Sequence, residues 1–453
     1  MTAQKTIYAL SSGAGTAGVA VIRLSGPDSF EALTTLTGRH DFEPRVATLC
    51  KLKDPDDRSH LDHALALPFK EPYSFTGEDV VELHIHGGRA VTEGVLSTLH
   101  KNKSLRMAEP GEFTRRAFEN GKMDLTEAEG LNDLIHAQTA AQRQLALRQM
   151  DGALRHLYEG WRRDLVSLLA HLEADIDFPD EDLPEGVAEA ARPKIRTLCS
   201  DLKGHLDDNN KGQALRNGFT IVILGAPNAG KSSLMNALAQ SDVAIVSDEA
   251  GTTRDAIEVN LDLGGYPVRF IDTAGIRENA GKVESEGIKR ALNKAEQAHL
   301  KLITIRADEW PDVSRETLEL IDDRSFVVFS QSDKADLDPA MFHVKHPSLR
   351  PVEVTTTSSV TQQGISDLLE KVERYSVAQM EINEAPILTR MRHRTALEEC
   401  ISHLERFDQS ATLDAVLAAE DVRMAARCLG SITGLIDVEE LLDVIFSDFC
   451  IGK

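Results

Sequence analysis

The chain has 453 residues, of which 42% are hydrophobic and 27% are charged, and its formal net charge is −23. This length exceeds what a single hydrophobic core can serve, so we expect about two to four domains. No apolar run approaches the roughly 20 residues needed to cross a bilayer, which excludes a membrane-spanning protein. The acidic balance repels nucleic acid at long range, so any such contact must use local basic patches or a partner protein.

Cysteines are scattered along the chain without any Cys-x-x-Cys pair, which argues against a disulfide framework or a zinc site. They are Cys50, Cys199, Cys400, Cys428 and Cys450. Residues 1–10 contain one lysine and no long apolar stretch, unlike a secretion signal. We therefore expect reduced thiols and a cytoplasmic protein.

The first part of the chain, residues 1 to about 120, mixes strand-like runs such as 19–24 and 80–85 with glycine-rich turns. This pattern predicts a compact α/β unit. After residue 122 apolar residues recur at helical spacing, and Thr126 followed by Glu129 predicts a capping box at the start of a helix.

The helical pattern is interrupted by an acidic, proline-containing stretch at residues 175–184. We expect it to resume after Pro193 and to end at Asn217-Gly218, because glycine just past a helix is a stop signal.

Residues 219 to about 375 alternate buried strand runs with helical segments, which predicts a doubly wound parallel sheet. The strand runs are 219–224, 268–271, 302–305 and 326–329, and from about residue 381 the pattern is helical again. The simplest architecture is multidomain, α/β plus α. It has an N-terminal α/β domain at 1–120, a helical bundle formed by 121–217 and 379–453, and an α/β domain inserted at 218–378.

A phosphate-binding motif opens the inserted domain. Gly225-Ala226-Pro227-Asn228-Ala229-Gly230-Lys231-Ser232 fits G-x-x-x-x-G-K-[ST] and follows the strand run directly, which is the context the motif requires. Backbone N–H groups of such a loop cradle phosphates, Lys231 can reach the β- and γ-phosphates, and the Ser232 hydroxyl can ligate Mg²⁺. A glycine-rich turn without a ligand is the weaker alternative.

Further segments follow in the order that a Ras-like P-loop G domain needs. Asp272-Thr273-Ala274-Gly275 closes a strand run, where the aspartate can hold the Mg²⁺ shell and the Gly275 N–H can meet the γ-phosphate. Gly251-Thr252-Thr253-Arg254-Asp255 lies between this segment and the P-loop, in the place of a switch whose Thr253 would complete the metal shell.

The guanine-reading segment is Asp333-Lys334-Ala335-Asp336, where G proteins normally have Asn-Lys-x-Asp. The Asp336 carboxylate is suited to accept two hydrogen bonds from guanine, whereas Asp333 lacks the amide donor of asparagine. We therefore expect guanine selectivity to persist and affinity to fall. Ser358-Ser359 can back the base as a last turn, and a solvated charged turn is the alternative reading of the 333–336 segment.

Hydrolysis needs a group that orients water, but the position after the Asp-x-x-Gly segment is Ile276. Polar candidates beyond it are Arg277, Glu278, Glu284 and Glu286, each of which can also be a solvated switch residue. No arginine finger can be assigned. The Asn228 amide and the 247–252 loop can instead supply oxygens to a monovalent cation that neutralises transition-state charge, unless Asn228 is only a turn residue.

Motifs both inside and outside this G domain resemble those of the MnmE (TrmE) family of tRNA wobble-uridine modification GTPases, over nearly the whole chain. They include the P-loop asparagine, the Gly-Thr-Thr-Arg-Asp switch, residues 74–79 (SFTGED), 86–88 (HGG), 110–118 (PGEFTRRAF), 121–125 (GKMDL), 177–181 (DFPDE), 432–434 (ITG) and the terminal 449–453 (FCIGK).

The resemblance implies a dimeric N-terminal domain that binds 5-formyl- or methylene-tetrahydrofolate through Arg23, Glu82, Lys122 and Lys453. Cys450 would point into that pocket, although a buried thiol at a helix end is the alternative. The resemblance also implies a homodimer that acts on tRNA with MnmG (GidA), a flavoprotein using FAD and NADH. The heterotetramer would add an aminomethyl or carboxymethylaminomethyl group to C5 of the wobble uridine.

In the same scheme GTP hydrolysis drives K⁺-dependent pairing of G domains. Ser232 and Thr253 would hold Mg²⁺, and Glu284, together with Lys231, would act in catalysis. Asn228, Ser247, Thr252 and the Glu249 backbone would hold K⁺. The residues expected around the nucleotide are Asn228, Ala229, Gly230, Lys231, Ser232, Ser233, Ser247, Asp248, Glu249, Ala250, Gly251, Thr252, Thr253, Asp272, Thr273, Ala274, Gly275, Asp333, Lys334, Asp336, Ser358 and Ser359.

The sequence departs from the family pattern in a few places. Residues 13–18 replace the usual Pro-Pro-Gly-x-Gly-Gly, Asp333 replaces asparagine, Glu249 an apolar residue and Ser359 alanine. These changes bear on nucleotide affinity and on the shape of one loop.

Two other classes remain open: a ribosome-assembly GTPase like Era or Der, for which no basic RNA module is visible, and a folate-dependent methyltransferase with a regulatory G domain. The densest basic cluster is Arg390, Arg392, His393 and Arg394, which is either a tRNA contact or a solvated helix face.

Overall fold

A computed structural model describes residues 5–13, 15–177, 187–208, 210–245, 258–272, 294, 296–335, 337–346, 352–381, 386–409, 415–436 and 439–453. The chain forms two compact units. The first comprises residues 1–132, 149–184 and 414–453, and the second comprises 133–148 and 185–413. The expected multidomain α/β plus α fold is confirmed, with one mixed sheet in each unit.

A six-stranded sheet of order β3-β4-β5-β2-β1-β6 forms the N-terminal part of the first unit. Its strands are β1 (Thr6–Leu10), β2 (Ala17–Ser25), β3 (Thr48–Lys53), β4 (His60–Phe69), β5 (Val80–Gly87) and β6 (Leu105–Met107). All neighbours are antiparallel except β1 and β6. Alternate residues of β3 are buried, as for Cys50 and Leu52, so one face of the sheet packs on α1 and α2 and the other faces outward.

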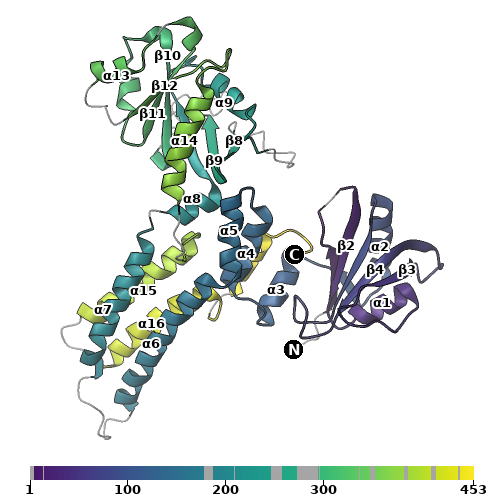
Figure 1. Ribbon diagram of the computed structural model, residues 1–453. Helices are drawn as coiled ribbons and strands as arrows, with labels where there is room; N and C mark the ends of the chain where they lie inside the picture. Colours follow the sequence, from purple (N-terminus) through teal and green to yellow (C-terminus); the bar gives the residue numbers. More distant parts are fainter. Residues whose placement is uncertain are drawn as a thin grey trace, which may run out of the picture. The chain divides into compact units, whose positions relative to one another are not determined.

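Helices complete the first unit. They are α1 (Ser29–Thr37), α2 (Arg89–Lys101), α3 (Glu112–Glu119), α4 (Leu125–His136), α6 (Ala153–Asp177), α16 (Ala415–Thr433) and α17 (Glu439–Ser447). The long helices α6 and α16 lie side by side (Figure 1). Helix α4 crosses the division, because residues 133–136 belong to the second unit.

The expected capping box of α4 is wrong by two residues. Asp124 is the capping side chain: its Oδ1 accepts hydrogen bonds from the Glu127 N–H and the Thr126 hydroxyl, both at 2.8 Å. The Glu127 carboxylate in turn accepts from the Asp124 N–H at 2.8 Å. Thr126 and Glu129 are buried inside the helix instead, so the pattern Asp-x-x-Glu, which also satisfies the capping rule, prevails.

The second unit contains a sheet of order β12-β11-β10-β7-β9-β8. Its strands are β7 (Phe219–Leu224), β8 (Glu258–Leu263), β9 (Tyr266–Asp272), β10 (Leu300–Arg306), β11 (Ser325–Ser330) and β12 (Glu353–Thr356). The predicted parallel arrangement is confirmed for every strand except β8, an antiparallel edge strand that the sequence reading missed. Strand β8 alternates buried and half-exposed residues, which is a weaker signal than the fully buried runs.

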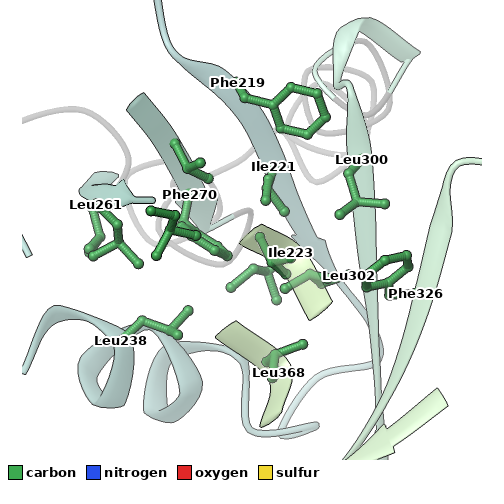
Figure 2. Close-up of a cluster of buried hydrophobic side chains, with 14 of the residues drawn as sticks. Phe219, Ile221, Ile223, Leu238, Leu261, Phe270, Leu300, Leu302, Phe326 and Leu368 are labelled. Atoms are coloured by element: carbon green, nitrogen blue, oxygen red, sulfur yellow. The ribbon is translucent and has the colours of Figure 1, made fainter. Parts of the chain in front are cut away.

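Apolar side chains from the sheet and the helices pack into one core on a face of this sheet (Figure 2). Ile221 and Ile223 of β7, Phe270 of β9 and Leu302 of β10 are fully buried there. Leu368, from helix α14, closes the same cluster. The core therefore fixes the strands whose carboxyl ends carry the predicted site.

The helices of the second unit are α5 (Ala140–Met150), α7 (Val187–Leu206), α8 (Lys211–Asn217), α9 (Lys231–Ala239), α12 (Arg315–Glu319), α13 (Ala340–Lys345), α14 (Ile365–Met380) and α15 (Met391–Gln409). Two 3₁₀ turns are η1 (Ala307–Glu309) and η2 (Ser332–Lys334). Helix α8 ends at Asn217 before Gly218, as expected, whereas α7 begins before Pro193 and runs through it.

Helices α7 and α15 pack side by side and are joined by ion pairs. Arg196 and Lys203 of α7 pair with Asp408 and Glu405 of α15 at 2.8 and 2.6 Å. No disulfide links the five cysteines, all of which lie in the described part of the chain. Among the described residues no helix is both long and apolar enough to cross a membrane.

We predict that Asp124 makes the stability of the first unit depend on pH. Burial raises the pKa of Asp124 to about 6. A carboxyl with a raised folded-state pKa stabilises the fold when protonated, and this contribution is lost as pH rises from about 4 through 6. Asp124→Asn keeps a capping oxygen without the charge, so its stability relative to wild type should increase between about pH 4 and pH 8.

Chemical denaturation at both pH values measures this difference. Asp124→Ala is the control: it removes the cap as well as the charge, so it should be less stable than Asp124→Asn by about 1 kcal/mol at both pH values. An Asp124→Asn difference that does not change with pH would contradict the prediction.

Candidate functional sites

The P-loop joins the carboxyl end of β7 to the start of α9. Gly225 has φ 149°, and a Cβ there would lie 2.3 Å from the Thr304 carbonyl oxygen of β10. Gly230 caps α9 with φ 88°, and Asn228 also has a positive φ, 63°. The two glycines are required because the left-handed region and the close approach to β10 both disfavour a side chain.

Lys231 and Ser232, at the first two positions of α9, lie where the sequence predicts. The buried Lys231 ammonium donates hydrogen bonds to the carbonyls of Gly225 and Ala226, at 3.1 and 2.8 Å, so it lies over the loop itself. The Ser232 hydroxyl donates to Oδ2 of Asp272 at 2.8 Å. Asp272 is fully buried at the end of β9. A hydroxyl and a carboxylate are hard oxygen groups of the kind that Mg²⁺ prefers.

The predicted guanine-reading segment lies beside the P-loop. Asp333 and Lys334 form η2 directly after β11. The Ser330 hydroxyl, at the end of β11, donates to the Ala229 carbonyl at 2.6 Å and so joins the two segments. The sequence reading missed Ser330; its only signal was a hydroxyl residue ending a buried strand.

Ser358 contacts Asp333 directly. Its buried hydroxyl donates to Oδ1 of Asp333 at 2.6 Å. This hydrogen bond holds the pKa of Asp333 below its ordinary value, so the carboxyl is ionised at neutral pH. The neighbouring Ser359 is half-buried, and its carbonyl accepts from the Gln362 amide at 2.9 Å. Ser233, in the first turn of α9, is exposed.

Several predicted site residues lie outside the described part of the chain. They are Ser247, Asp248, Glu249, Ala250, Gly251, Thr252, Thr253, Thr273, Ala274, Gly275, Glu284 and Asp336. Their nucleotide-binding, metal-binding and catalytic roles stay predictions.

A second candidate site lies on the outward face of the N-terminal sheet. Arg23 of β2 and Glu82 of β5 are cross-strand partners, and their side chains form an ion pair with an Nη2–Oε1 distance of 2.9 Å. The Arg23 guanidinium lies 5.3 Å from the centre of the Phe75 ring and 5.7 Å from that of Phe113. Cation–π contacts with two rings fix the guanidinium in one place. His84 Nε2 lies 3.5 Å from the other Glu82 oxygen.

Lys122 borders the loop that carries Phe75. Its ammonium donates to the Pro72 carbonyl at 2.8 Å, and its aliphatic part lies next to Gly77, where a Cβ would come 3.3 Å from Cδ of Lys122. Arg23 and Lys122 therefore both contact the segment 72–77, and Glu82 is joined to it through Arg23.

The chain terminus docks against β1. The Ser11 hydroxyl donates to the Gly452 carbonyl at 2.7 Å, and a Cβ on Gly452 would lie 2.1 Å from the Leu10 carbonyl oxygen. Lys453 follows directly. Cys450 is exposed and lies beyond the end of α17, so the alternative of a buried thiol at a helix end is wrong.

A buried ion cluster supports this second site from behind. Arg116 of α3 is 2% exposed and contacts both Glu112 and Glu78, at 2.9 and 3.1 Å. Burial raises the pKa of Glu112, but hydrogen bonds from Arg106 and Arg116 outweigh it and keep that pKa below its ordinary value. The cluster ties α3, which carries Phe113, to the loop that carries Phe75.

Three of the four residues of the basic cluster at 390–394 are paired or buried within the chain. Arg390 pairs with Asp133 at 2.9 Å, and Arg394 pairs with Asp208 at 2.6 Å. His393 is fully buried. Arg390, His393 and Arg394 therefore do not form a solvated helix face, and a tRNA contact by this cluster stays a prediction.

Two family models match the chain: the MnmE helical domain over residues 125–450, and the N-terminus of the GTP-binding protein TrmE over residues 6–122. The tRNA modification GTPase MnmE of Parvibaculum lavamentivorans is 51% identical over 451 residues, which cover 99% of this chain and 100% of the relative. The protein of the same name from Paramagnetospirillum magneticum is 51% identical over 449 residues, with the same coverage.

Among solved structures, the G domain of the T. maritima FeoB iron transporter is 26% identical, covers 35% of this chain and 98% of that chain, and has a TM-score of 0.27. The family assignment rests on the full-length relatives and on the helical-domain model, which spans well over half of the residues. The chain belongs to the MnmE family of tRNA modification GTPases.

Proposed function

We propose that this chain hydrolyses GTP and, with a flavoprotein partner of the MnmG (GidA) type, modifies C5 of the tRNA wobble uridine. The observation that carries the GTPase part is the hydrogen bond from Ser232 to the buried Asp272, with Lys231 over the same loop. In this proposal residues 218–378 form the inserted G domain, and the reaction takes place in the cytoplasm.

The P-loop residues would act by position and charge. Phosphoryl transfer is accelerated mainly by stabilising the charge that develops on the phosphate oxygens. Lys231 would exchange its two loop carbonyls for the β- and γ-phosphate oxygens. Mg²⁺, held by Ser232 and Thr253 with Asp272 in support, would neutralise further charge.

A monovalent cation would replace the arginine that other GTPases use. The left-handed backbone of Asn228 lies inside the P-loop, where an amide oxygen can face the phosphates. We propose K⁺ bound by Asn228, Ser247, Thr252 and the Glu249 backbone, with Glu284 orienting the water. G domains of two copies would pair around it.

The outward sheet face supports a dimer of the N-terminal domain. Leu49 of β3 and Leu65 of β4 are cross-strand partners and are 70% and 44% exposed, and Val19 of β2 is 58% exposed. Apolar side chains gathered on one open face mark an interaction surface. We propose that a second copy covers it.

Tetrahydrofolate would bind at the Arg23–Glu82 pair on the same face. The pterin ring offers N–H donors to the Glu82 carboxylate, and the glutamate tail favours the ammonium groups of Lys122 and Lys453. The bound 5-formyl- or methylene-tetrahydrofolate would supply the one-carbon unit. The aminomethyl or carboxymethylaminomethyl product follows from the family, and the partner would provide the redox chemistry.

We predict that K⁺ accelerates GTP hydrolysis relative to Na⁺, and that Asn228→Ala removes the difference. The reason is that the amide oxygen is a cation ligand in this scheme. Steady-state GTPase rates in the two salts measure it, with Asn236→Ala, which removes an exposed amide further along α9, as the matched control. Equal rates for wild type in both salts would exclude the cation mechanism.

We predict that Asp333→Asn tightens GTP binding by about 2- to 10-fold, the scale of one net hydrogen bond of roughly 0.5–1.5 kcal/mol. The asparagine oxygen can still accept from Ser358, while its amide adds a donor for the base. Isothermal titration calorimetry with a non-hydrolysable GTP analogue measures the affinity. Unchanged or weaker binding counts against the assignment of Asp333 to the base site.

We predict that Arg23→Ala weakens binding of 5-formyltetrahydrofolate by about tenfold or more, because Glu82 loses the guanidinium that orients it and stays half-buried without that partner. Fluorescence or calorimetric titration measures binding. Arg89→Ala is the control, since Arg89 pairs with Glu93 at 2.7 Å and both side chains are exposed on the outer side of α2. GTPase activity should not change in either variant, and equal folate affinity in both would place the folate site elsewhere.

A further inference from the structure

Two ion pairs lie where the chain enters and leaves the G domain, and their residues Asp133, Arg216 and Arg390 form what we call the joint. Arg216, in the entry helix α8, places Nε 2.8 Å from Oδ1 of Asp133, at the end of α4. Arg390, directly before α15 at the end of the exit segment, places Nη2 2.9 Å from the same oxygen. Residues far apart in the sequence therefore converge on one carboxylate.

Burial makes these ion pairs sensitive to the loss of either partner. The Asp133 side chain is 13% exposed, that of Arg390 is 16% exposed and that of Arg216 is 28% exposed. Removing the carboxylate would leave two partly buried guanidinium groups without this acceptor, which costs more than breaking an exposed pair. Charge-assisted hydrogen bonds at these distances also fix the geometry of the three side chains.

The backbones at the joint are in direct contact. A Cβ on Gly212 of α8 would lie 2.1 Å from the Leu388 carbonyl oxygen of the exit segment, so only glycine allows this approach. The Gln142 amide of α5 donates to the Arg216 carbonyl at 2.9 Å. The Ala141 N–H donates to the Gly265 carbonyl, in the turn between β8 and β9, at 3.0 Å.

The hydrophobic core continues through the joint. Leu145 of α5, Leu215 of α8 and Ile387 of the exit segment belong to the same cluster as the β7 side chains Ile221 and Ile223. Close-packed interiors move as rigid bodies rather than deforming. The end of α4, α5, α8 and the exit segment are thus one body with the sheet that carries the P-loop.

The other end of α4 lies in the first unit. Leu125 and Ala128, in its first turns, pack with Leu442, Phe446 and Phe449 from α17 and the residues after it. The segment beyond α17 is bonded to the N-terminal domain: the Gly111 N–H donates to the Cys450 carbonyl at 3.4 Å. A single helix of 12 residues therefore joins the Asp133 joint to the packing of the C-terminal tail.

We infer that α4 transmits the nucleotide state of the G domain to the tail beside the Arg23 site, and that Asp133 is the positioning residue that couples the helix to the G domain. The inference rests on the proposed function. Rotation of the G-domain body would move Asp133 through Arg216 and Arg390, and α4 would carry that displacement to α17. Breaking the joint would leave GTP hydrolysis intact and uncouple it from tRNA modification.

The experiment uses the full-length chain with its flavoprotein partner, GTP, tetrahydrofolate and unmodified tRNA. For Asp133→Asn and the milder Arg390→Lys, kcat and KM for GTP should stay within about twofold of wild type. Modified uridine formed per GTP hydrolysed should fall by about tenfold for Asp133→Asn, within the range typical of coupling between sites. Asp133→Glu, which keeps the charge, should recover much of the yield.

Asp207→Asn is the matched control, because its exposed carboxylate lies in the loop before α8 and its loss changes the net charge equally. Gly212→Ala tests the joint without any change of charge and should also lower the yield per GTP. Retained GTPase activity reports that each variant's G domain is folded.

An unchanged yield per GTP in Asp133→Asn overturns the inference. A GTPase rate that falls as far as the yield per GTP also overturns it, because Asp133 would then act on hydrolysis itself. The same experiment separates this failure from that of the proposed function. In the latter case the wild-type chain itself would neither hydrolyse GTP nor modify the uridine.

Discussion

The predicted nucleotide site depends on how closely the P-loop after β7 approaches β10 and β11 at the carboxyl end of the sheet. Gly225 passes so near the β10 backbone that a side chain would collide with Thr304, and the Ser330 hydroxyl of β11 holds the Ala229 carbonyl of the loop. These contacts shape the P-loop from outside. Because β7, β9 and β11 are parallel, their carboxyl ends bring Lys231, Asp272 and the guanine-reading segment to one place.

The second site is built on buried charge rather than on strand ends. Arg116 holds Glu78 and Glu112 in the interior, and those contacts tie together the elements that carry the two aromatic rings in contact with Arg23. A buried ion cluster of this kind adds little to stability but requires one arrangement of its partners. Glu78, Glu112 and Arg116, which belong to the family-like motifs, therefore hold the surroundings of the Arg23–Glu82 pair in place.

In so acidic a chain, the positions of the arginine side chains limit how much positive charge is left to contact tRNA. In the described part of the chain, Arg390 pairs with Asp133 in the joint, and Arg394 pairs with Asp208, which lies before α8. Arg192 and Arg196 serve the α7–α15 pair through Asp408. These arginines hold elements together, so in a chain of net charge −23 they contribute little exposed positive charge for nucleic acid.

Local patterns in the sequence determined the elements with strong signals. The bounds of β7 agree with the predicted run at both ends. The P-loop motif identified Lys231 and Ser232, and the Asp-x-x-Gly segment after another strand run identified Asp272, because consecutive residues fix that chemistry. The sequence did not predict the antiparallel edge strand β8, the capping role of Asp124 or the course of α7 through Pro193. In each case the local signal was weak or a competing signal was equally strong.

By itself, then, the sequence determined the strongest strand runs, the P-loop motif and the family. Only the tertiary structure decided which distant residues meet: Ser358 with Asp333, Ser330 with the P-loop, Arg116 with two glutamates, and Asp133 with Arg216 and Arg390. Side-chain hydrogen bonds and ion pairs depend on positions set by packing over the whole unit. No periodicity or motif in one stretch of chain contains that information.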